Sequence, residues 1–322
     1  MRDLEVDIQL ALGTLHPVRR VSFAVERGET LCIVGESGCG KSLTALAVMG
    51  LLPRRAERRA GRMILDGIDL MRASAQAISD LRGSRMAMIF QEPMTSLNPT
   101  YSVGNQMEEM LLRHRKVTRR EARERAVFLL EKVGITAAAG RLAQYPHQLS
   151  GGLRQRVMIA MVLMCGPDLI LADEPTTALD VTTQAQILRL LAELRKEFGM
   201  GLLLITHDLG IVARIADRVA VMYAGQIVEE GSVAAVFGEP RHPYTRGLMD
   251  CIPVPGKVAR GSHLGSIPGM VPSLVGELAG CSFRERCAHA RAGCEADIAL
   301  RVNDAGHACR CILEGAEPEL AA

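Results

Sequence analysis

One short stretch of the chain carries a pattern that binds phosphate groups. Residues 32–46, CIVGESGCGKSLTAL, consist of an apolar run, a glycine-rich turn and a segment of helical character. The turn matches G-x-x-x-x-G-K-[ST], in which backbone N–H groups and a helix N-terminus surround phosphates, the lysine reaches the β- and γ-phosphates, and the final hydroxyl binds magnesium. The predicted nucleotide contacts are Gly35, Glu36, Ser37, Gly38, Cys39, Gly40, Lys41 and Ser42. The alternative is a turn without a ligand, but its place between a strand and a helix favours phosphate binding.

Two adjacent carboxylates end a second apolar run. LILADEP, residues 169–175, places Asp173 and Glu174 at the end of a predicted strand. Asp173 is suited to hold magnesium through water. Glu174 is then available to orient and deprotonate an attacking water. Alone, the pair could be a solvated loop; together with the phosphate loop it predicts nucleotide hydrolysis.

A third motif lies between these two. In QLSGGLRQRVMIA, residues 148–160, Ser150, Gly151 and Gly152 precede a helix that we expect to start near Leu153. A serine and two glycines at a helix N-terminus form an anion-binding end. Since the chain already has a phosphate loop, the two elements would serve different nucleotides. A head-to-tail pair of chains, with each nucleotide held between them, satisfies that requirement.

The surrounding pattern predicts the elements that position these motifs. The segment from Val6 to Ile33 alternates like antiparallel strands, and VSFAVERGE suggests a hairpin. A helix through SLTALAVMGLL is expected to stop at Pro53, and residues 104–146 look helical. There, Thr118 with Glu121 predicts a capping box, and Gly134 a helix end.

Buried strands and helices alternate in the second half of the core. Residues 168–173 and 201–208 are apolar enough for buried strands, and an amphipathic helix through AQILRLLAELRKEFG separates them. This alternation predicts an α/β fold with a mostly parallel sheet. From about residue 238, Pro and Gly recur and the pattern becomes loop-like.

Composition limits the classes of protein that the chain can belong to. Its 322 residues carry a net charge of +2, no Trp and 3% aromatic residues, so nucleic acid is not expected as a partner. No apolar run approaches the ~20 residues of a membrane helix. The opening MRDLEVDIQL lacks the layout of a secretion signal. We therefore expect a soluble chain on the cytoplasmic side.

The ordered motifs resemble one family. The set GESGCGKS, Gln91 in MIFQEPMTSLNP, LSGGLRQR, LILADEP, Ala178-Leu179-Asp180 and His207 in LLLITHD is similar to the ATP-binding subunits of ABC transporters, over roughly residues 5–230. The resemblance implies a P-loop NTPase (RecA-like) core with an antiparallel β subdomain and a helical ABC subdomain at about 92–160. It gives a nucleotide-binding domain at 1–237 and a small Cys-rich C-terminal extension at 238–322.

The resemblance also implies roles for individual residues. Gln91 would contact magnesium and face a membrane subunit, and His207 would hold the γ-phosphate and position Glu174. Without the ordered set, Gln91 and His207 would be read as structural. With ATP and Mg2+ as cofactors, the implied magnesium ligands are Ser42, Gln91 and Asp173. The residues implied to contact the partner chain's nucleotide or link the two sites are Ser150, Gly151, Gly152, Gln155 and Asp180.

One position departs from the family pattern. The family usually stacks adenine on an aromatic residue just under thirty positions before the loop lysine, and here that position is Leu12, with His16 nearby. Losing an aromatic stack costs about 1 kcal/mol. The sequence therefore supports phosphate binding more strongly than adenine binding.

Two further segments narrow the resemblance to a branch. QEPMTSLNPTYSVGNQ (91–106) and RHPYTRGLMDCIP (241–253) are similar to the oligopeptide, dipeptide and nickel importers. The first segment follows Gln91 and is placed to form a groove for a helix of the membrane partner. Without the resemblance, RHPYTRGL would be the capped start of an ordinary helix.

Five of the nine cysteines crowd the end of the chain. Four others, Cys32, Cys39, Cys165 and Cys251, are scattered and read as small core or loop residues. Clustered thiolates in a reducing compartment favour an iron–sulfur cluster or structural zinc, with unligated thiols as a third alternative. Some members of the branch carry a [4Fe–4S] cluster here, and the position after His307 favours Cys311 over Cys309. The implied ligands are Cys281, Cys287, Cys294 and Cys311.

These observations predict the ATP-hydrolysing subunit of an importer for peptides or a similar small solute. Its implied partners are a second ABC ATPase subunit, identical or paralogous, two transmembrane permease subunits and an extracytoplasmic solute-binding protein. It would lie on the cytoplasmic face of the inner membrane as a peripheral protein. The alternative is an ATPase subunit of a soluble complex, such as one for phosphonate degradation.

Overall fold

The computed structural model describes residues 1–91, 96–177, 179–252, 265–276 and 278–313. The chain divides into two compact units: unit 1 is Met1–Ala24, Leu31–Met71 and Thr206–Ala322, and unit 2 is Val25–Thr30 and Arg72–Ile205. In the part of the chain that is described, no helix is both long and apolar enough to cross a membrane. The predicted boundary after residue 237 falls inside unit 1.

An antiparallel sheet opens unit 1. Strand β1 (Leu4–Leu10) lies between β2 (Gly13–Val21) and β4 (Ala56–Arg59), and its residue Ile8 faces Leu15 and Ala56. The hairpin predicted at VSFAVERGE is wrong, because the turn lies between β1 and β2. Residues 22–29 do not form a strand pair with β2. The N–H of Phe23, for example, donates a hydrogen bond to the Met1 carbonyl.

Parallel strands in unit 1 carry the phosphate loop. β3 (Thr30–Val34) pairs in parallel with β10 (Arg218–Tyr223), and β10 pairs antiparallel with β11 (Gln226–Ser232). Helix α1 (Lys41–Met49) begins directly after the loop. It ends at Gly50, whose φ is +64°, and therefore before the predicted stop at Pro53.

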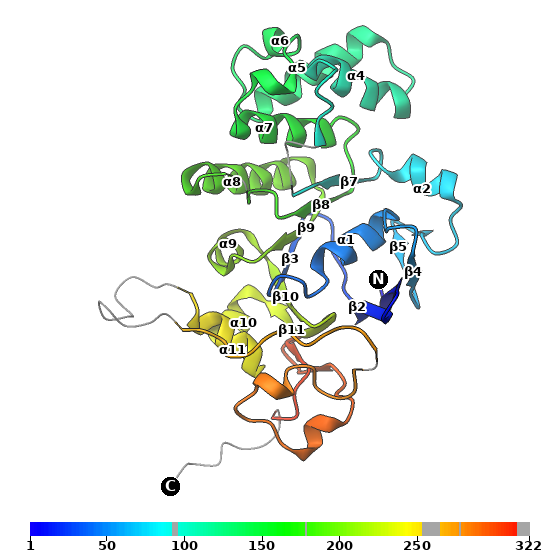
Figure 1. Cartoon of the computed structure of the whole chain (residues 1–322). Helices are drawn as coiled ribbons and strands as arrows, with labels where there is room; N and C mark the ends of the chain where they lie inside the picture. The colour runs from blue at the N-terminus through cyan, green and yellow to red at the C-terminus, as the bar shows by residue number, and fades with distance from the viewer. Residues whose placement is uncertain (92–95, 178, 253–264, 277, 314–322) are drawn as a thin grey trace. The chain divides into compact units, whose positions relative to one another are not determined.

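Three parallel strands form the centre of unit 2. β8 (Leu169–Asp173) lies between β7 (Met86–Ile89) and β9 (Gly201–Thr206), with both pairings parallel. Helix α8 (Val181–Phe198) connects β8 to β9, as the sequence predicts (Figure 1). All residues of β7 and β9 are buried, which matches the continuous apolar runs.

Helices follow β7 in unit 2, in the region predicted as a helical subdomain (Figure 1). The predicted capping box is present: Thr118 accepts from the Glu121 N–H at 3.2 Å, and the Glu121 carboxylate accepts from the Thr118 N–H at 2.7 Å. Gly134, at φ +78°, follows the helix that this box begins. The helices are α4 (Val103–His114), α5 (Arg119–Lys132), α6 (Ala138–Arg141) and α7 (Gly151–Val162), with the short turn η1 (Pro146–Gln148) before α7.

The C-terminal tail adds two strands to the sheet of unit 1 that contains β11. Strand β13 (Ala308–Cys309) pairs with β11, and β12 (Arg301–Val302) pairs with β13. Residues 265–276 form a loop, as expected, with one bridge from Val275 to Leu15. The remaining elements are β5 (Ile64–Leu65), β6 (Ile68–Asp69), α2 (Ala75–Leu81), α9 (Leu209–Ile215), α10 (Val233–Gly238), α11 (Pro243–Asp250), η2 (Arg284–Arg286) and η3 (Ala292–Glu295).

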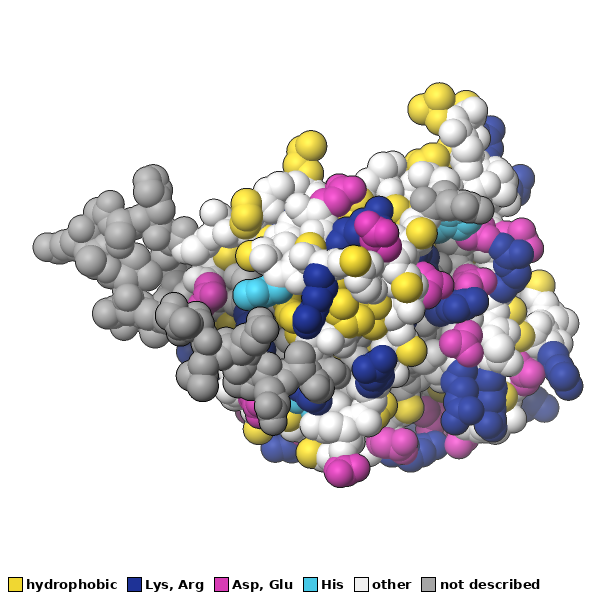
Figure 2. Space-filling view, turned by 90° about the horizontal axis from the view of Figure 1, so that it is seen from below, with side chains coloured by type: hydrophobic (Ala, Val, Ile, Leu, Met, Phe, Trp, Pro, Cys, Tyr) yellow, Lys and Arg dark blue, Asp and Glu magenta, His cyan; other side chains and the backbone are white. Residues whose placement is uncertain are grey.

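The surface seen in Figure 2 carries both charge signs. Lys and Arg side chains are mixed with Asp and Glu side chains over this face, with apolar side chains between them. The mixture agrees with the net charge of +2.

Candidate functional site

The phosphate loop needs glycine where it packs most closely. A Cβ atom on Gly35 would lie 2.1 Å from the Met222 carbonyl oxygen, and one on Gly40 would lie 2.0 Å from the Pro17 carbonyl oxygen. Both glycines also have positive φ values, +154° and +102°. Gly40 is the N-cap of α1, so the tight loop leads directly into the helix N-terminus.

Lys41 is positioned by the loop itself. Its side chain is buried, and its Nζ atom donates to the carbonyl oxygens of Gly35 at 2.8 Å and Glu36 at 3.0 Å. The backbone therefore curls around the ammonium group. Ser37 and Gly38 at the loop tip are exposed, and Ser42 is half-buried in the first turn of α1. This arrangement offers a cation, N–H groups and a hydroxyl to an incoming phosphate.

Cys39 is a packing residue within the loop. Burial raises the pKa of its thiol, although Lys41 lies nearby. A thiol with a raised pKa is a poor nucleophile. Cys39 is therefore a small buried residue, as predicted for the scattered cysteines. Cys32 and Cys165 are buried as well, and Cys251 is half-buried.

The two carboxylates of unit 2 end strand β8. Asp173 is buried, and Glu174 is half-buried in the left-handed region, at φ +43°. A non-glycine residue in this region is strained and persists only where its surroundings fix it. Here the Glu174 N–H donates to the Ile205 carbonyl at 2.9 Å. The strand end thus turns the Glu174 side chain in a defined direction.

Two neighbours hold the Glu174 carboxylate. Gln91 Nε2 donates to Glu174 Oε2 at 3.3 Å, and Thr177 Oγ1 donates to the same oxygen at 2.9 Å. The structure therefore brings Gln91 and Glu174 together, a contact that the ordered motifs did not predict. Sequence reasoning missed Thr177, for which the only signal was a hydroxyl three residues after the carboxylate. Ala178, in the motif that follows, lies outside the described residues, as do residues 92–95 after Gln91.

The serine–glycine motif forms the predicted helix start. Ser150 is the N-cap of α7, and its hydroxyl accepts from the Leu153 N–H at 3.4 Å. The helix begins at Gly151, two residues earlier than expected. A Cβ atom on Gly152 would lie 3.1 Å from the Thr183 methyl group, so glycine fits here.

Gln155, in the same motif, points into the protein interior. Its side chain is fully buried, and within the described residues neither its amide nitrogen nor its amide oxygen has a hydrogen-bond partner. Position 155 faces inward on α7, and the nucleotide contact of Gln155 remains a prediction.

Asp180 has a local structural role that sequence reasoning missed. It is the N-cap of α8: its Oδ1 accepts from the Thr183 N–H at 3.0 Å, and its Oδ2 accepts from Thr183 Oγ1 at 2.7 Å. These hydrogen bonds lower the pKa of the Asp180 carboxyl group, so it is ionised at neutral pH. A link between two active sites remains a prediction for this residue.

The other predicted contacts lie in unit 1. His207 follows β9 and is exposed, in the same unit as the phosphate loop. Leu12 is 92% exposed at the turn between β1 and β2. His16 instead contacts Asp7, with Nδ1 2.6 Å from Oδ1. Of the two candidates near adenine, Leu12 is thus the one that projects into solvent.

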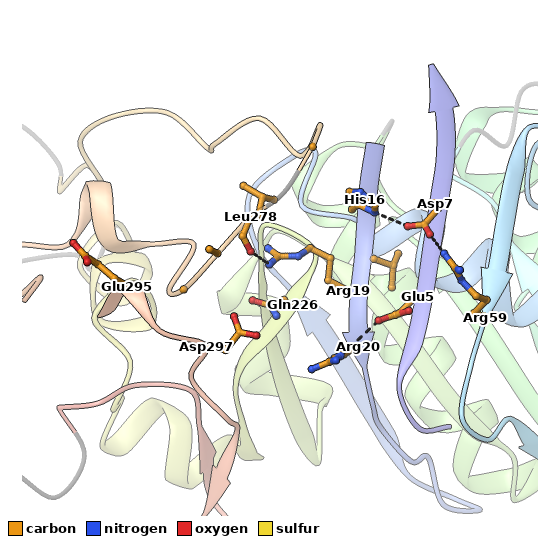
Figure 3. Close-up of a pocket in the computed structure, with 14 residues that line it drawn as sticks. Glu5, Asp7, His16, Arg19, Arg20, Arg59, Gln226, Leu278, Glu295 and Asp297 are labelled. Atoms are coloured by element: carbon orange, nitrogen blue, oxygen red, sulfur yellow. Dashed lines mark hydrogen bonds and ion pairs between the residues drawn. The ribbon is translucent and has the colours of Figure 1, made fainter. Parts of the chain in front are cut away.

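A separate cavity of about 580 Å³ lies in unit 1 and includes no residue of the phosphate loop (Figure 3). Its charged side chains compensate one another. Asp7 pairs with both His16 and Arg59, and Arg19 donates to the Leu278 carbonyl at 2.8 Å. The cavity therefore has balanced charge and gives no sign of an anion site.

The four predicted ligand cysteines lie in the C-terminal tail. Burial raises the pKa of the Cys281 thiol, and the proximity of Cys294, Cys311 and Cys287 raises it further. Cys309 is instead fully buried in β13, opposite Glu229 of β11. Across the described ranges, however, no three His, Cys, Asp or Glu side chains are arranged to hold a metal ion.

Comparison with known proteins agrees with this geometry. The profile described as ABC transporter matches residues 18–177, and the profile described as oligopeptide/dipeptide transporter, C-terminal region, matches residues 228–294. A dimeric structure of MJ0796, a bacterial ABC transporter cassette, superposes with a TM-score of 0.63 and 26% identity. The match covers 71% of this chain and 98% of that one.

Named relatives match over most of their length. The dipeptide transport ATP-binding protein DppD of Bacillus subtilis is 49% identical over 296 residues, which cover 92% of this chain and 88% of the relative. The oligopeptide transport ATP-binding protein OppD of the same organism is 48% identical over 291 residues, covering 90% and 81%. A Brucella melitensis protein named for peptide import is 52% identical over 306 residues, covering 92% and 90%. The chain therefore belongs to the family of ABC transporter ATP-binding proteins and is an ATPase of that family.

Proposed function

We propose that this chain hydrolyses ATP to drive the import of peptides or similar small solutes across the cytoplasmic membrane. The observation that carries the proposal is the presence of two phosphate-binding helix starts in one chain. One is the Lys41 loop before α1, and the other is the Ser150-capped start of α7. A single nucleotide needs only one such loop, so the second supports a paired ATPase.

Within one chain, we assign the roles as follows. Residues 35–42 hold the phosphates, with Lys41 supplying the charge. Bound magnesium would place positive charge on the β- and γ-phosphate oxygens, and the oxygen ligands it prefers are present in Ser42, Asp173 and Gln91. Glu174 accepts a proton from the attacking water, and His207 contacts the γ-phosphate and positions Glu174.

Between two chains, we assign Ser150, Gly151 and Gly152 to the nucleotide of the partner chain. Asp180 would then connect the two sites near the start of α8. We also assign Leu12, which is 92% exposed, to the place beside adenine. The neighbouring MJ0796 structures support this assembly, because one is dimeric and another is a dimeric post-hydrolysis state bound to ADP and phosphate. The partner chain is either identical or paralogous.

The names of the relatives support the proposed association with membrane subunits. DppD and OppD are named for dipeptide and oligopeptide transport. By this similarity, the chain works with two transmembrane permease subunits and an extracytoplasmic solute-binding protein, as a peripheral protein at the cytoplasmic face of the inner membrane. The match at residues 228–294 favours this role over a soluble phosphonate-degradation complex. Residues 1–237 would then be the ATPase domain and residues 238–322 the extension.

Copurification and transport test this function together. The tagged chain, expressed at native level, should retain two permease subunits in detergent, and deletion of its gene should abolish uptake of labelled di- or oligopeptides. Uptake should return with the wild-type chain and not with Lys41→Ala. Recovery of soluble lyase subunits in place of permeases, with normal peptide uptake in the deletion strain, would exclude the proposal.

We also propose that Cys281, Cys287, Cys294 and Cys311 are the residues that bind a [4Fe–4S] cluster. Their proximity around Cys281 supports this set, and the separate place of Cys309 in β13 argues against that residue. The present side-chain arrangement is not itself a ligand set. Anaerobically purified protein should contain iron and acid-labile sulfide, which Cys311→Ser should remove and Cys309→Ser should leave. Zinc, or no metal, would contradict the assignment.

A further inference from the structure

An arginine of the C-terminal tail is bonded to the phosphate loop. Arg286 and Glu36 are 250 positions apart, yet their side chains form a two-pronged ion pair. One guanidinium nitrogen donates to Glu36 Oε2 at 2.7 Å, and the other donates to Glu36 Oε1 at 3.0 Å. Arg286 is 4% exposed and Glu36 is 30% exposed. Such a bidentate, partly buried pair fixes the orientation of both groups.

All five N–H bonds of the Arg286 guanidinium group point to a hydrogen-bond acceptor. Besides the two bonds to Glu36, its Nε donates to the Pro268 carbonyl at 2.9 Å and one terminal nitrogen donates to the Ile267 carbonyl at 3.1 Å. The other terminal nitrogen lies 3.3 Å from the Tyr223 hydroxyl. A guanidinium group has five N–H bonds, so Glu36, Tyr223 and residues 267–268 together hold this side chain in a single position.

The backbone of Glu36 is held as well. Its N–H donates to the hydroxyl of Tyr244 in α11 at 2.9 Å. The Tyr244 ring is fully buried against Tyr223, with ring centroids 4.6 Å apart, and Arg286 lies over the Tyr223 ring at 5.7 Å. The side chain and the backbone of one loop residue are thus both held from the C-terminal region.

The position of Glu36 gives this pair a consequence for ATP binding. A carboxylate inside a loop that surrounds phosphates repels them, since like charges at short range in a partly buried site cost free energy. The opposing charge of Arg286 cancels that repulsion and keeps the carboxylate turned to the tail. Lys41 Nζ, which bonds to the Glu36 carbonyl, stays available for the phosphate.

We propose that Arg286 is a positioning residue for ATP: it neutralises and holds the Glu36 carboxylate so that the phosphate loop accepts an anionic ligand. This inference rests on the proposed ATP binding at residues 35–42. It assigns to the tail a direct part in nucleotide affinity, in addition to any role in binding a metal cluster.

A double-mutant cycle tests the proposal. MgATP affinity is measured by titration calorimetry in the Glu174→Gln background, which separates binding from hydrolysis. Arg286→Met should weaken ATP binding about tenfold, and the loss should shrink as salt screens the carboxylate. Glu36→Gln removes the repelling charge. The double variant Glu36→Gln with Arg286→Met should therefore bind within about twofold of Glu36→Gln alone.

Two further variants separate electrostatics from folding. Arg284→Met changes an arginine two residues earlier in the same turn and should bind ATP like its parent. Arg286→Lys keeps the charge without the two-pronged geometry; it should lose about threefold, again cancelled by Glu36→Gln, and it decides the matter if Arg286→Met unfolds. Unchanged affinity in the Arg286 variants, or an equal loss with and without Glu36→Gln, overturns the proposal. A parent protein that does not bind MgATP overturns the proposed function itself.

Discussion

Gln91 and Glu174 lie opposite each other because of the register of two parallel strands. Ile89 of β7 pairs with Ala172 of β8, and each functional residue comes two positions after its partner in that pair. The Gln91 Nε2 atom is consequently 3.3 Å from Glu174 Oε2. The strand ends thus place an amide donor on the Glu174 carboxylate.

Glu174→Gln should stop ATP hydrolysis and leave ATP binding intact. The substitution keeps the size of the side chain and removes its capacity to accept a proton, a contribution worth about 10²–10⁴ in rate. Steady-state ATPase activity and MgATP affinity should be measured on the same preparation. Glu193→Gln, on the exposed face of α8, is the matched control and should retain normal turnover. Rapid hydrolysis by Glu174→Gln would remove the assigned role.

Thr177→Val should reduce turnover through the orientation of Glu174. The Thr177 hydroxyl donates to Glu174 Oε2 at 2.9 Å and to the Glu174 carbonyl at 3.2 Å. Without it the carboxylate gains freedom, so kcat should fall about tenfold while KM for ATP changes little. Thr177→Ser keeps the hydroxyl and should restore most of the rate. A larger change in KM than in kcat would indicate a substrate-binding role instead.

The elements that depend on local pattern could be predicted from the sequence. Capping at Thr118, the helix end at Gly134 and the strand before Asp173 each follow from residues close in the chain. The hairpin could not be placed reliably, because both Val6–Val21 and VSFAVERGE alternate. Only the pairing of the strands distinguishes these two possible hairpins. In the structure β1 pairs with β2 on one side and with β4 on the other.

Contacts between distant residues could not be predicted. No local signal links Glu36 to Arg286, since the pair depends on how the tail packs against β11. For Gln155 a local motif is present, but the motif does not predict the burial of the side chain. The motif begins a helix as predicted, with Ser150 as the N-cap, and Gln155 is buried within that helix. Motif order predicts the site, whereas the burial of Gln155 depends on packing that the motif does not indicate.

Ser150 substitutions should separate helix capping from contact with the partner chain. Ser150→Ala removes the bond to the Leu153 N–H and should lower the free energy of unfolding by about 1 kcal/mol. Ser150→Asp keeps an N-cap acceptor but points a negative charge at the partner's nucleotide. In the Glu174→Gln background with MgATP, light scattering should show pairing for the parent and none for Ser150→Asp. Normal pairing of a stable Ser150→Asp protein would contradict the proposed contact.

The stability of the chain should decline in acid partly because of His242. This side chain is 1% exposed and caps α11, with Nδ1 accepting from the Tyr244 N–H at 3.1 Å. Burial, with Arg310 and Arg246 nearby, lowers the pKa of His242 to about 3. The unfolded chain binds a proton near pH 6.5 and the folded chain does not. Stability is therefore full above pH 6.5 and falls as the pH drops from 6.5 towards 3.

His242→Asn should remove this part of the pH dependence. Asparagine is a good N-cap and does not titrate, so α11 keeps its start. Below pH 6.5 each pH unit can change the free energy of unfolding by at most about 1.4 kcal/mol per proton. Between pH 7.5 and 5.5, urea unfolding should show a fall smaller by about 1 kcal/mol in His242→Asn than in the wild type. Carboxylates are mostly ionised in this range in both proteins, so equal falls would mean that His242 is protonated in the folded chain, against the effect of its burial.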